Sequence, residues 1–199
     1  MWELEYAAME QGYTGICGCD EAGAGPLAGP VYAAAVILPF GLEIPGLTDS
    51  KKLTEKKREA LFPIIKEKAV AWAVASVDEK EIDATDILSA RMKAMQLAID
   101  ALGGKADFAL IDGNRAKDFG MAVRTGVKGD SLSANIAAAS VLAKVTRDDL
   151  MVEMAQEFPG YGFEVHKGYG TKAHYEALRE KGPCAIHRMT FLKKFYGEK

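Results

Sequence analysis

Four acidic residues occupy positions from which a protein can bind a ligand. Asp20 and Glu21 end the first apolar run of the chain. Asp112 directly follows the apolar run FALI, and Asp130 directly follows the sequence RTGVKG. Ligands of α/β proteins bind just beyond the ends of strands, so we expect the four carboxylates to meet at one site. Each acid taken alone also fits an ordinary turn, because Asp after a strand is common turn chemistry.

Such a cluster would need cations. Carboxylates that lie close together repel one another, which raises their pKa values unless positive charge neutralises them. A ligand set made of carboxylate oxygens favours Mg²⁺ or Mn²⁺ over zinc. Two such ions about 4 Å apart would activate a water molecule and stabilise the leaving oxygen of a phosphodiester. The pattern therefore predicts metal-assisted phosphodiester hydrolysis, with these residues as catalytic residues and metal ligands: Asp20, Glu21, Asp112 and Asp130.

The residues behind the first two acids form a glycine-rich loop. Gly23, Gly25 and Gly29 have no side chains, so backbone groups of this loop can approach a sugar-phosphate closely. The pattern does not match the phosphate-binding loop that ends in Gly-Lys-Ser/Thr. Pro26 and Pro30 also interrupt any G-x-G-x-x-G motif that would open a helix. A binder of small phosphates or nucleotides is therefore a remote alternative.

The elements that must position these residues are strands and helices in a mixed order. Apolar runs predict strands at residues 13–19, 29–38, 70–77, 108–111 and 121–127. Helical spacing of apolar residues predicts helices at residues 1–13, 54–67, 84–102, 133–156 and 172–180. Strands come first and helices later, which favours an α/β fold with a mixed central sheet flanked by helices over a regular βαβ barrel.

The composition is typical of a globular protein that folds by itself. The chain has 199 residues, and 49% of them are hydrophobic, which is ample for a packed core. A net charge of −3, from 25 basic and 28 acidic residues, does not by itself indicate a polyanionic partner. No apolar stretch approaches about 18 residues, and the N-terminus is acidic where a signal peptide would be basic. We expect a soluble, cytoplasmic protein without a membrane partner.

Several longer motifs follow one another along the chain. Residues 20–31 read DEAGAGPLAGPV, and TDSKKLT, LIDGN, KGD with AAASVLAKVTRD, HKGYGT and HRMTF come after them in this order. These motifs resemble those of the bacterial type 2 ribonucleases H, the ribonuclease HII family, whose opening motif is D-E-A-G-R-G-P-L-A-G-P-V. The resemblance extends from about residue 13 to residue 195, nearly the whole chain.

The resemblance implies an RNase H-like fold, with residues 1–155 as the catalytic domain and residues 156–199 as a small C-terminal helical region that binds substrate. It implies a monomeric endoribonuclease that uses Mg²⁺ or Mn²⁺ at the four carboxylates. Members of this family cut on the 5′ side of a ribonucleotide, in RNA–DNA hybrids or embedded in duplex DNA, and leave 3′-hydroxyl and 5′-phosphate ends. We therefore expect a role in removing ribonucleotides and RNA primers from DNA.

The resemblance also assigns substrate contacts. Gly23, Ala24 and Gly25 would read the ribose 2′-hydroxyl, the group that distinguishes RNA from DNA, largely through the backbone. Tyr169 would stack on the following deoxyribose, where a ribose would clash. The other expected substrate-binding residues lie in the motifs quoted above: Ser50, Lys51, Lys52, Asn114, Lys128 and Ser133.

Some of these residues have an alternative role. Lys51 and Lys52 precede the expected helix N-cap Thr54, where a bound anion would relieve the positive charge, but a solvated run of charges is the alternative. Ser133 would bond the substrate backbone or cap the following helix, and we prefer the cap.

The remaining polar residues carry less specific signals. Lys144 and Arg147 would extend the basic track or lie on an exposed helix face, and Asp148 suits a supporting salt bridge. The three histidines lack zinc-site spacing and are expected to be structural: His166, His174 and His187.

Ala24 is the main departure from the family motif, which has arginine at this position. Alanine permits the same backbone path, so reading of the 2′-hydroxyl can survive. The change removes a guanidinium beside the substrate backbone, and with it a phosphate contact worth about one unit of salt slope. Arg91, within the expected helix 84–102, is a smaller departure. Two interpretations stay open: an active metal-dependent endoribonuclease, which we favour, and a weakened variant that binds ribonucleotide-containing duplexes with little turnover.

Overall fold

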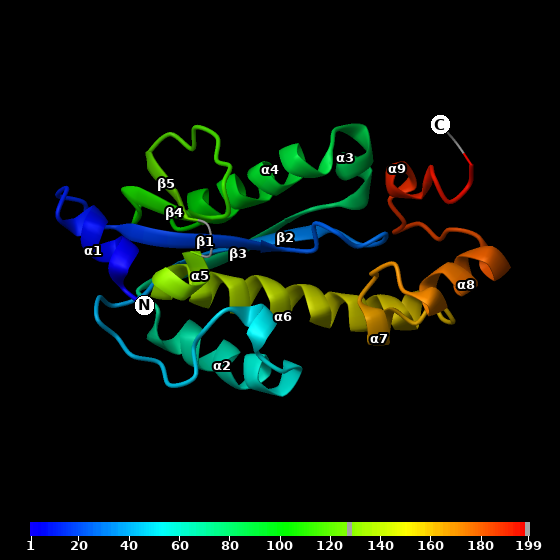
Figure 1. Ribbon diagram of the computed structural model, residues 1–199, viewed down its shortest axis with the longest axis horizontal. Coiled ribbons are helices and arrows are strands. Elements are labelled where there is room, and N and C mark those ends of the chain that lie inside the picture. Colours follow the sequence, from blue (N-terminus) through cyan, green and yellow to red (C-terminus); the bar gives the residue numbers. More distant parts are fainter. Residues whose placement is uncertain (127–128, 198–199) are drawn as a thin grey trace.

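A computed structural model describes residues 1–126 and 129–197 of the chain, without the side chain of Asp130. One five-stranded sheet forms its centre, with strand order β3-β2-β1-β4-β5 (Figure 1). The strands are β1 Ile16–Ala22, β2 Val31–Ile37, β3 Ala71–Val77, β4 Phe108–Asp112 and β5 Ala122–Gly126. The helices are α1 Glu3–Met9, η1 Ser50–Lys52, α2 Glu55–Lys68, α3 Glu79–Ala84, α4 Ile87–Asp100, α5 Gly129–Leu132, α6 Ala134–Glu157, α7 Phe163–His166, α8 Lys172–Lys181 and α9 Met189–Leu192.

The sheet is mixed, as the sequence predicts. β1 pairs with β2, and β2 with β3, in antiparallel fashion, whereas β1 pairs with β4, and β4 with β5, in parallel fashion. The carboxyl ends of the three parallel strands therefore lie at one edge of the sheet. In the β1–β4 register Cys19 lies opposite Ile111, which brings the next residues of the two strands, Asp20 and Asp112, side by side.

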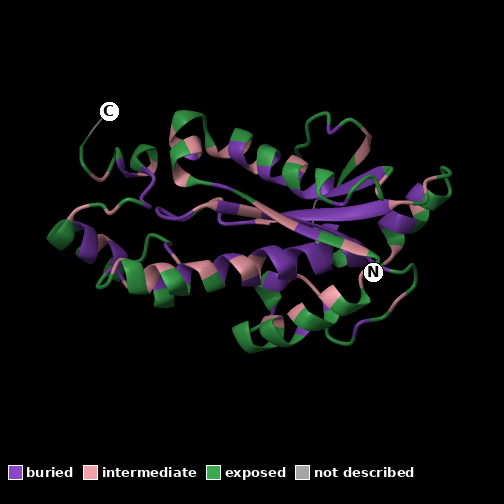
Figure 2. Ribbon diagram, turned by 180° about the vertical axis from the view of Figure 1, so that it is seen from behind, coloured by how far each residue is buried: buried purple, intermediate pink, exposed green. Residues whose placement is uncertain are grey.

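Helices cover both faces of the sheet. α4 packs on one face over the small side chains of β1 and β2, and α6 packs on the other with α2 outside it (Figure 1). The three central strands β1, β2 and β4 are almost entirely buried between these layers (Figure 2). The continuously apolar runs VYAAAVI and FALI thus reflect burial on both faces, which removes the alternation seen in half-exposed strands.

Gly18 allows α6 to lie close against β1. A Cβ atom at this position would overlap the backbone of Asn135 and Ile136 at the start of α6. The Asn135 side chain completes the junction, because its Nδ2 donates to the Ile16 carbonyl at 2.9 Å and its Oδ1 accepts the Leu38 N–H at 2.8 Å. The first turn of α6 is thereby fixed against the two central strands.

The C-terminal region packs against the loop between β1 and β2. One cluster of buried side chains joins Ala28 of that loop to Met151 of α6 and Phe163 of α7, and a second joins Leu27 to Leu178 and Leu192. α6 runs to Glu157, so the predicted division at residue 155 falls within its last turn. The two-part organisation itself stays a prediction.

Several boundaries differ from those predicted. The first strand begins at Ile16 and continues to Ala22, so Asp20 and Glu21 lie within β1 rather than at its end. The predicted helix 84–102 begins only at Ile87, because Asp86 caps α4 by accepting the N–H groups of Leu88 and Ser89. The short helices α3, α5, α7 and α9 were not predicted, since segments of four to six residues carry little periodic signal.

Candidate active site

Asp20 lies buried at the centre of the candidate active site, with only 3% of its surface exposed. Its Oδ1 accepts the N–H of Glu21 at 2.7 Å. Burial raises the pKa of the Asp20 carboxyl well above its usual value, and the charges of Glu21 and Asp112 raise it further, while the charge of Lys51 lowers it. Three of the four predicted carboxylates are thus close enough to interact electrostatically, as the sequence analysis expects.

Glu21 points toward the opposite face of the sheet, because successive side chains of a strand alternate. There its Oε1 lies 2.5 Å from Nη2 of Arg91, which projects from α4. The Nε atom of Arg91 is buried and has no hydrogen-bond partner among the described residues. Arg91 therefore neutralises Glu21, a contact that the sequence did not indicate.

Asp112 ends β4 and is held from the α5 side, because its Oδ1 accepts the N–H of Gly129 at 3.0 Å. A polar pocket of about 250 Å³ lies beside it and is lined by Arg91, Gly113, Asn114 and Arg115. The backbone of Asp130 belongs to α5, but its side chain lies outside the described structure, as does the whole of Lys128. Asn114 is exposed at the pocket rim, where a substrate can reach it.

The carboxylates suit a divalent cation in the kind of atoms they offer. Carboxylate oxygens are the ligands that Mg²⁺ and Mn²⁺ prefer, and a cation would relieve the repulsion that raises the pKa of Asp20. Within the described part of the chain, no three His, Cys, Asp or Glu side chains are arranged as a ready-made metal site. Binding at Glu21 would require this carboxylate to exchange the guanidinium of Arg91 for the ion.

The glycine loop, residues 23–30, is held by the buried guanidinium of Arg188. This group donates to three backbone carbonyls of the loop, at 2.6 Å to Gly23, 3.1 Å to Ala24 and 2.9 Å to Gly29. The planar donor fork of arginine suits several acceptors at once. The path of the loop at position 24 is therefore fixed through its carbonyls, independently of the side chain that stands there.

A second buried arginine, Arg147 of α6, holds the other end of the loop. It donates to the carbonyls of Ala28 and Pro30, each at 3.1 Å, and to that of Lys167 at 3.0 Å. Gly23 has a φ of +95°, and a Cβ atom there would overlap the Arg147 side chain. Both roles predicted for Arg147, extension of the basic track and a place on an exposed helix face, are wrong: the side chain is fully buried and binds backbone carbonyls.

Tyr169 lies beside the glycine loop, as the resemblance implies. A Cβ atom placed on Gly25 would lie 3.7 Å from Cε1 of the tyrosine ring. The ring is 42% exposed, and Nζ of Lys144 lies 5.8 Å from its centroid. Exposed aromatic rings beside cations are the kind of surface on which nucleotides stack.

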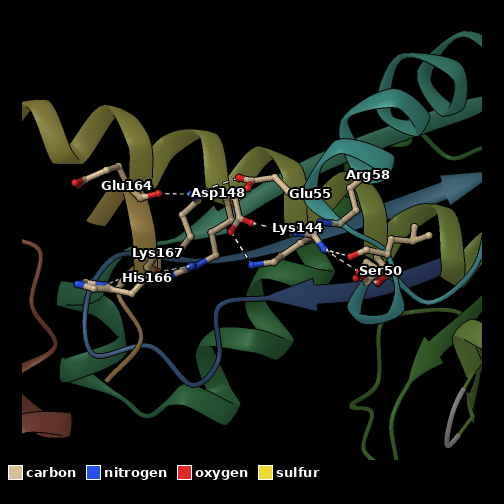
Figure 3. Close-up of polar contacts among 12 residues, drawn as sticks. Ser50, Glu55, Arg58, Lys144, Asp148, Glu164, His166 and Lys167 are labelled. Atoms are coloured by element: carbon tan, nitrogen blue, oxygen red, sulfur yellow. Dashed lines mark hydrogen bonds and ion pairs between the residues drawn. The ribbon is translucent and has the colours of Figure 1, made fainter. Parts of the chain in front are cut away.

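The basic segment before α2 is partly committed to structure. Lys51 and Lys52 are exposed on η1, and the charge of Lys51 acts on Asp20. Arg58 donates to the carbonyl of Ser50 at 3.0 Å and lies 3.9 Å from Asp148 of α6 (Figure 3). The salt bridge expected for Asp148 is therefore present, and its shorter partner is Lys144, at 2.7 Å.

Two predicted substrate contacts face the interior. Ser133 is fully buried: its Oγ accepts the N–H of Ile136 at 3.0 Å and donates to Oε1 of Glu5 at 2.6 Å. The structure thus supports the preferred role as helix cap and contradicts a substrate contact. Ser50 is 4% exposed and its hydroxyl accepts from Ser140, so its side chain serves the junction of η1 with α6.

Sequence reasoning missed Arg188 and misplaced Arg147. Both lie in motifs that carry the family resemblance, HRMTF and AAASVLAKVTRD, and this was the available signal. Their acceptors in the glycine loop are backbone carbonyls more than 100 positions away, Gly23 and Pro30 among them. No spacing within either motif identifies such partners.

Comparison with known proteins agrees with this geometry. The family described as Ribonuclease HII matches residues 17–194. The ribonuclease HII of Ruminiclostridium cellulolyticum is 51% identical over 195 residues, which cover 98% of this chain and 76% of that protein. The ribonuclease HII of Geobacter sulfurreducens is 51% identical over 191 residues, which cover 96% and 88%.

Solved structures show the same architecture. The structure described as the PCNA:RNase HII complex from Archaeoglobus fulgidus superposes with a TM-score of 0.74 at 25% identity, covering 92% of this chain and 95% of that one. Bst-RNase HIII in complex with Mn²⁺ gives a TM-score of 0.56 at 18% identity, covering 88% and 64%.

The fold and the sequence are therefore those of an RNase H-type endonuclease, an enzyme class that cleaves RNA in RNA–DNA hybrids. Within this class, the chain belongs to the ribonuclease HII family. None of the helices in the described residues is both long and apolar enough to span a bilayer.

Proposed function

We propose that this enzyme is a Mg²⁺- or Mn²⁺-dependent endoribonuclease that cuts on the 5′ side of a ribonucleotide, in RNA–DNA hybrids or within duplex DNA. The products would be 3′-hydroxyl and 5′-phosphate ends, and the biological role would be removal of ribonucleotides and RNA primers. The enzyme would act as a monomer in the cytoplasm. The observation that carries the proposal is the buried Asp20 carboxylate, crowded by Glu21 within β1 and by Asp112 at the end of the neighbouring parallel strand β4.

The four carboxylates would hold the ions: Asp20, Glu21, Asp112 and Asp130. When bound, divalent cations supply an activated water and charge stabilisation at the phosphodiester. The residues of the chain hold the reacting groups in place. Asp20 and Asp112 each accept a backbone N–H through Oδ1, from Glu21 and Gly129 respectively, which restrains both carboxylates. Lys51 would bind a substrate phosphate nearby.

The glycine loop would select the ribonucleotide. Because Arg188 fixes the carbonyls of Gly23 and Ala24, the loop keeps its conformation without the family's arginine. This supports an active enzyme over the weakened variant, since backbone reading of the 2′-hydroxyl needs only the loop path. Tyr169 would then stack on the sugar that follows, beside Gly25.

The direct test uses a labelled DNA duplex with one embedded ribonucleotide and an all-DNA duplex of the same sequence as control. We expect cleavage 5′ to the ribonucleotide with Mg²⁺ or Mn²⁺ and none with EDTA. The Asp112→Asn protein should be inactive. Cleavage that persists in EDTA, or that occurs equally in the all-DNA duplex, would contradict the proposal.

A further inference from the structure

The three histidines of the chain lie together beneath the loop that carries Tyr169. His174 and His187 are 0% and 3% exposed, and their Nε2 atoms are 3.0 Å apart. The ring of His166 stacks on that of His174, with centroids 4.4 Å apart and an interplanar angle of 14°. These residues lack zinc-site spacing, which predicts a structural role, and their arrangement gives them a more specific task.

The hydrogen bonds fix which ring nitrogen of each buried histidine carries the proton. Nδ1 of His174 lies 2.9 Å from the carbonyl oxygen of Tyr169, and a carbonyl can only accept, so Nδ1 is the protonated atom. Nε2 of a neutral His174 must then accept, and Nε2 of His187 donates to it. Nδ1 of His187 in turn accepts the N–H of Cys184 at 2.9 Å, a shorter contact than the 3.3 Å to the Cys184 carbonyl.

The third histidine holds the other flank of Tyr169. Nε2 of His166 lies 2.8 Å from the carbonyl of Tyr161 and must donate, so its Nδ1 accepts the N–H of Gly168 at 3.2 Å. The N–H of Tyr169 itself donates to the carbonyl of His166 at 2.9 Å. Both peptide groups of Tyr169 are thus tied to the histidine cluster.

The same cluster is joined to the glycine loop. The backbone of His187 pairs with that of Ala28 as an isolated β-bridge, and the next residue, Arg188, donates to the carbonyls of Gly23 and Ala24. A chain of contacts therefore leads from the glycine loop through His187 and His174 to the carbonyl of Tyr169. The glycine loop and the loop that carries Tyr169 are connected through these contacts.

From this geometry we infer that His187 and His174 form a neutral, directional hydrogen-bond relay that positions the Tyr169 ring relative to the glycine loop. Both histidines are positioning residues, and the inference rests on the proposed substrate contact of Tyr169. The relay requires both rings to be neutral, because one added proton would place two donors face to face. Burial lowers the pKa of both imidazoles, which keeps them neutral at physiological pH.

Nuclear magnetic resonance tests the relay without any activity. Long-range ¹H–¹⁵N spectra of the wild-type protein at pH 7.5 distinguish the two tautomers of each imidazole. We expect the proton on Nδ1 for His174 and on Nε2 for His166 and His187, with signals assigned through the His174→Asn and His187→Gln proteins. A proton on Nε2 of His174, or a doubly protonated ring, would overturn the inference.

Kinetics test the consequence for substrate. His174→Leu and His187→Leu should each raise KM for the single-ribonucleotide duplex by about tenfold, the scale of one lost aromatic stacking contact, with kcat within about threefold. His187→Gln keeps a donor at the Nε2 position and should restore KM to near the wild-type value. Combining His174→Leu with Tyr169→Leu should add little to Tyr169→Leu alone, since both changes remove the same contact.

A matched control separates positioning from loss of stability. Tyr161→Phe removes the 2.7 Å hydrogen bond to the Gly182 carbonyl in the same cluster and should lower the melting temperature without changing KM. If the wild-type protein cuts the duplex but the folded His174→Leu and His187→Leu proteins keep the wild-type KM, the positioning role is refuted and the proposed function stands. If the wild-type protein cuts no ribonucleotide-containing duplex, the proposed function fails, and the tautomers still decide whether the relay exists.

Discussion

Glu21 and Arg91 form an ion pair between β1 and α4, with Oε1 and Nη2 2.5 Å apart. The carboxylate is one of the expected metal ligands, and the guanidinium belongs to Arg91, which the family resemblance marks as a departure. A cation that binds Glu21 must compete with a positive charge that the chain itself supplies. We therefore expect the pair to weaken metal binding at the candidate site and to hold Glu21 in place without metal.

Replacing Arg91 by Gln should strengthen metal binding. The Arg91 guanidinium competes with the ion for Glu21, and a partly exposed ion pair of this kind is worth about 1 kcal/mol. Its removal should therefore lower the dissociation constant for Mn²⁺ about fivefold. Calorimetric titration with Mn²⁺ in the absence of substrate measures this. Arg115→Gln is the matched control, because Arg115 lines the same polar pocket but is exposed. An unchanged or weaker affinity in Arg91→Gln would show that the pair does not compete.

Replacing Asp20 by Asn should stabilise the metal-free protein and abolish cleavage. The pKa of Asp20 is raised by burial and by Glu21 and Asp112, so stability falls as pH rises from the usual Asp range through the raised value. Removing this charge should raise the melting temperature in EDTA at pH 7.5, by about 2–4 °C for each 1 kcal/mol of relief.

Cleavage by the Asp20→Asn protein should fall by more than about a hundredfold, because a metal ligand supports several kcal/mol of transition-state stabilisation. Asp100→Asn, on the exposed side of α4, should change neither the melting temperature nor the rate of cleavage. A lower melting temperature in Asp20→Asn would contradict the electrostatic argument.

Replacing Arg188 by Met should destabilise the protein strongly. The change leaves the carbonyls of Gly23, Ala24 and Gly29 without their donor in a buried site. We expect the free energy of unfolding to fall by about 3 kcal/mol, measured by urea denaturation. Arg179→Met, an exposed change of the same kind on α8, should cost less than about 1 kcal/mol. Equal losses in the two variants would argue against the anchoring role.

Introducing arginine at position 24 should add a phosphate contact without altering the loop. The slope of log affinity against log salt should become steeper by about 0.9, the contribution of one phosphate contact, and KM should fall at low salt. Ala24→Gln, which has a similar length and no charge, should leave the slope unchanged. Because the loop is already fixed by Arg188, kcat should stay within about threefold; a rise of a hundredfold would instead support the weakened-variant interpretation.

The buried histidines should make the protein sensitive to acid. Burial, followed by the charge of His174, lowers the pKa of His187 from 6.5 to about 4, so the unfolded chain takes up a proton in this range before the native protein does. Stability contributed by the neutral ring is complete above pH 6.5 and is lost as pH falls toward 4. The loss attributable to His187 should be about 1–2 kcal/mol after allowance for solvent screening.

Urea denaturation at pH 6.5, 5.5 and 4.5 measures this loss, and the difference between wild type and His187→Gln isolates it. Over part of this range the Asp20 carboxyl makes the protein more stable as pH falls, the opposite of the effect of His187. Subtracting the two curves removes this contribution, because Asp20 is present in both proteins. Parallel stability curves for the two proteins would show that His187 does not titrate as described.

The sequence by itself determined which acidic residues lie close together at the candidate site. Asp20, Glu21 and Asp112 could be assigned because an acid at the end of an apolar run is a local feature, and parallel strands place such ends at one edge. The strands followed from apolar runs and the longer helices from the helical spacing of apolar residues, which together predicted the mixed sheet and its flanking helices. The caps at Thr54 and Ser133 also follow from local rules, because a cap bonds an N–H three residues later.

Only the tertiary structure decided which groups these residues meet. Ser133 could not be placed inside from its motif, because its burial depends on Glu5 of α1, 128 positions away. Arg147 and Arg188 have backbone carbonyls as acceptors, and every residue carries one, so no residue type marks them as partners. The pairing of Glu21 with Arg91 likewise depends on the packing of α4 over β1, since alternation along the strand turns adjacent carboxylates to opposite faces of the sheet.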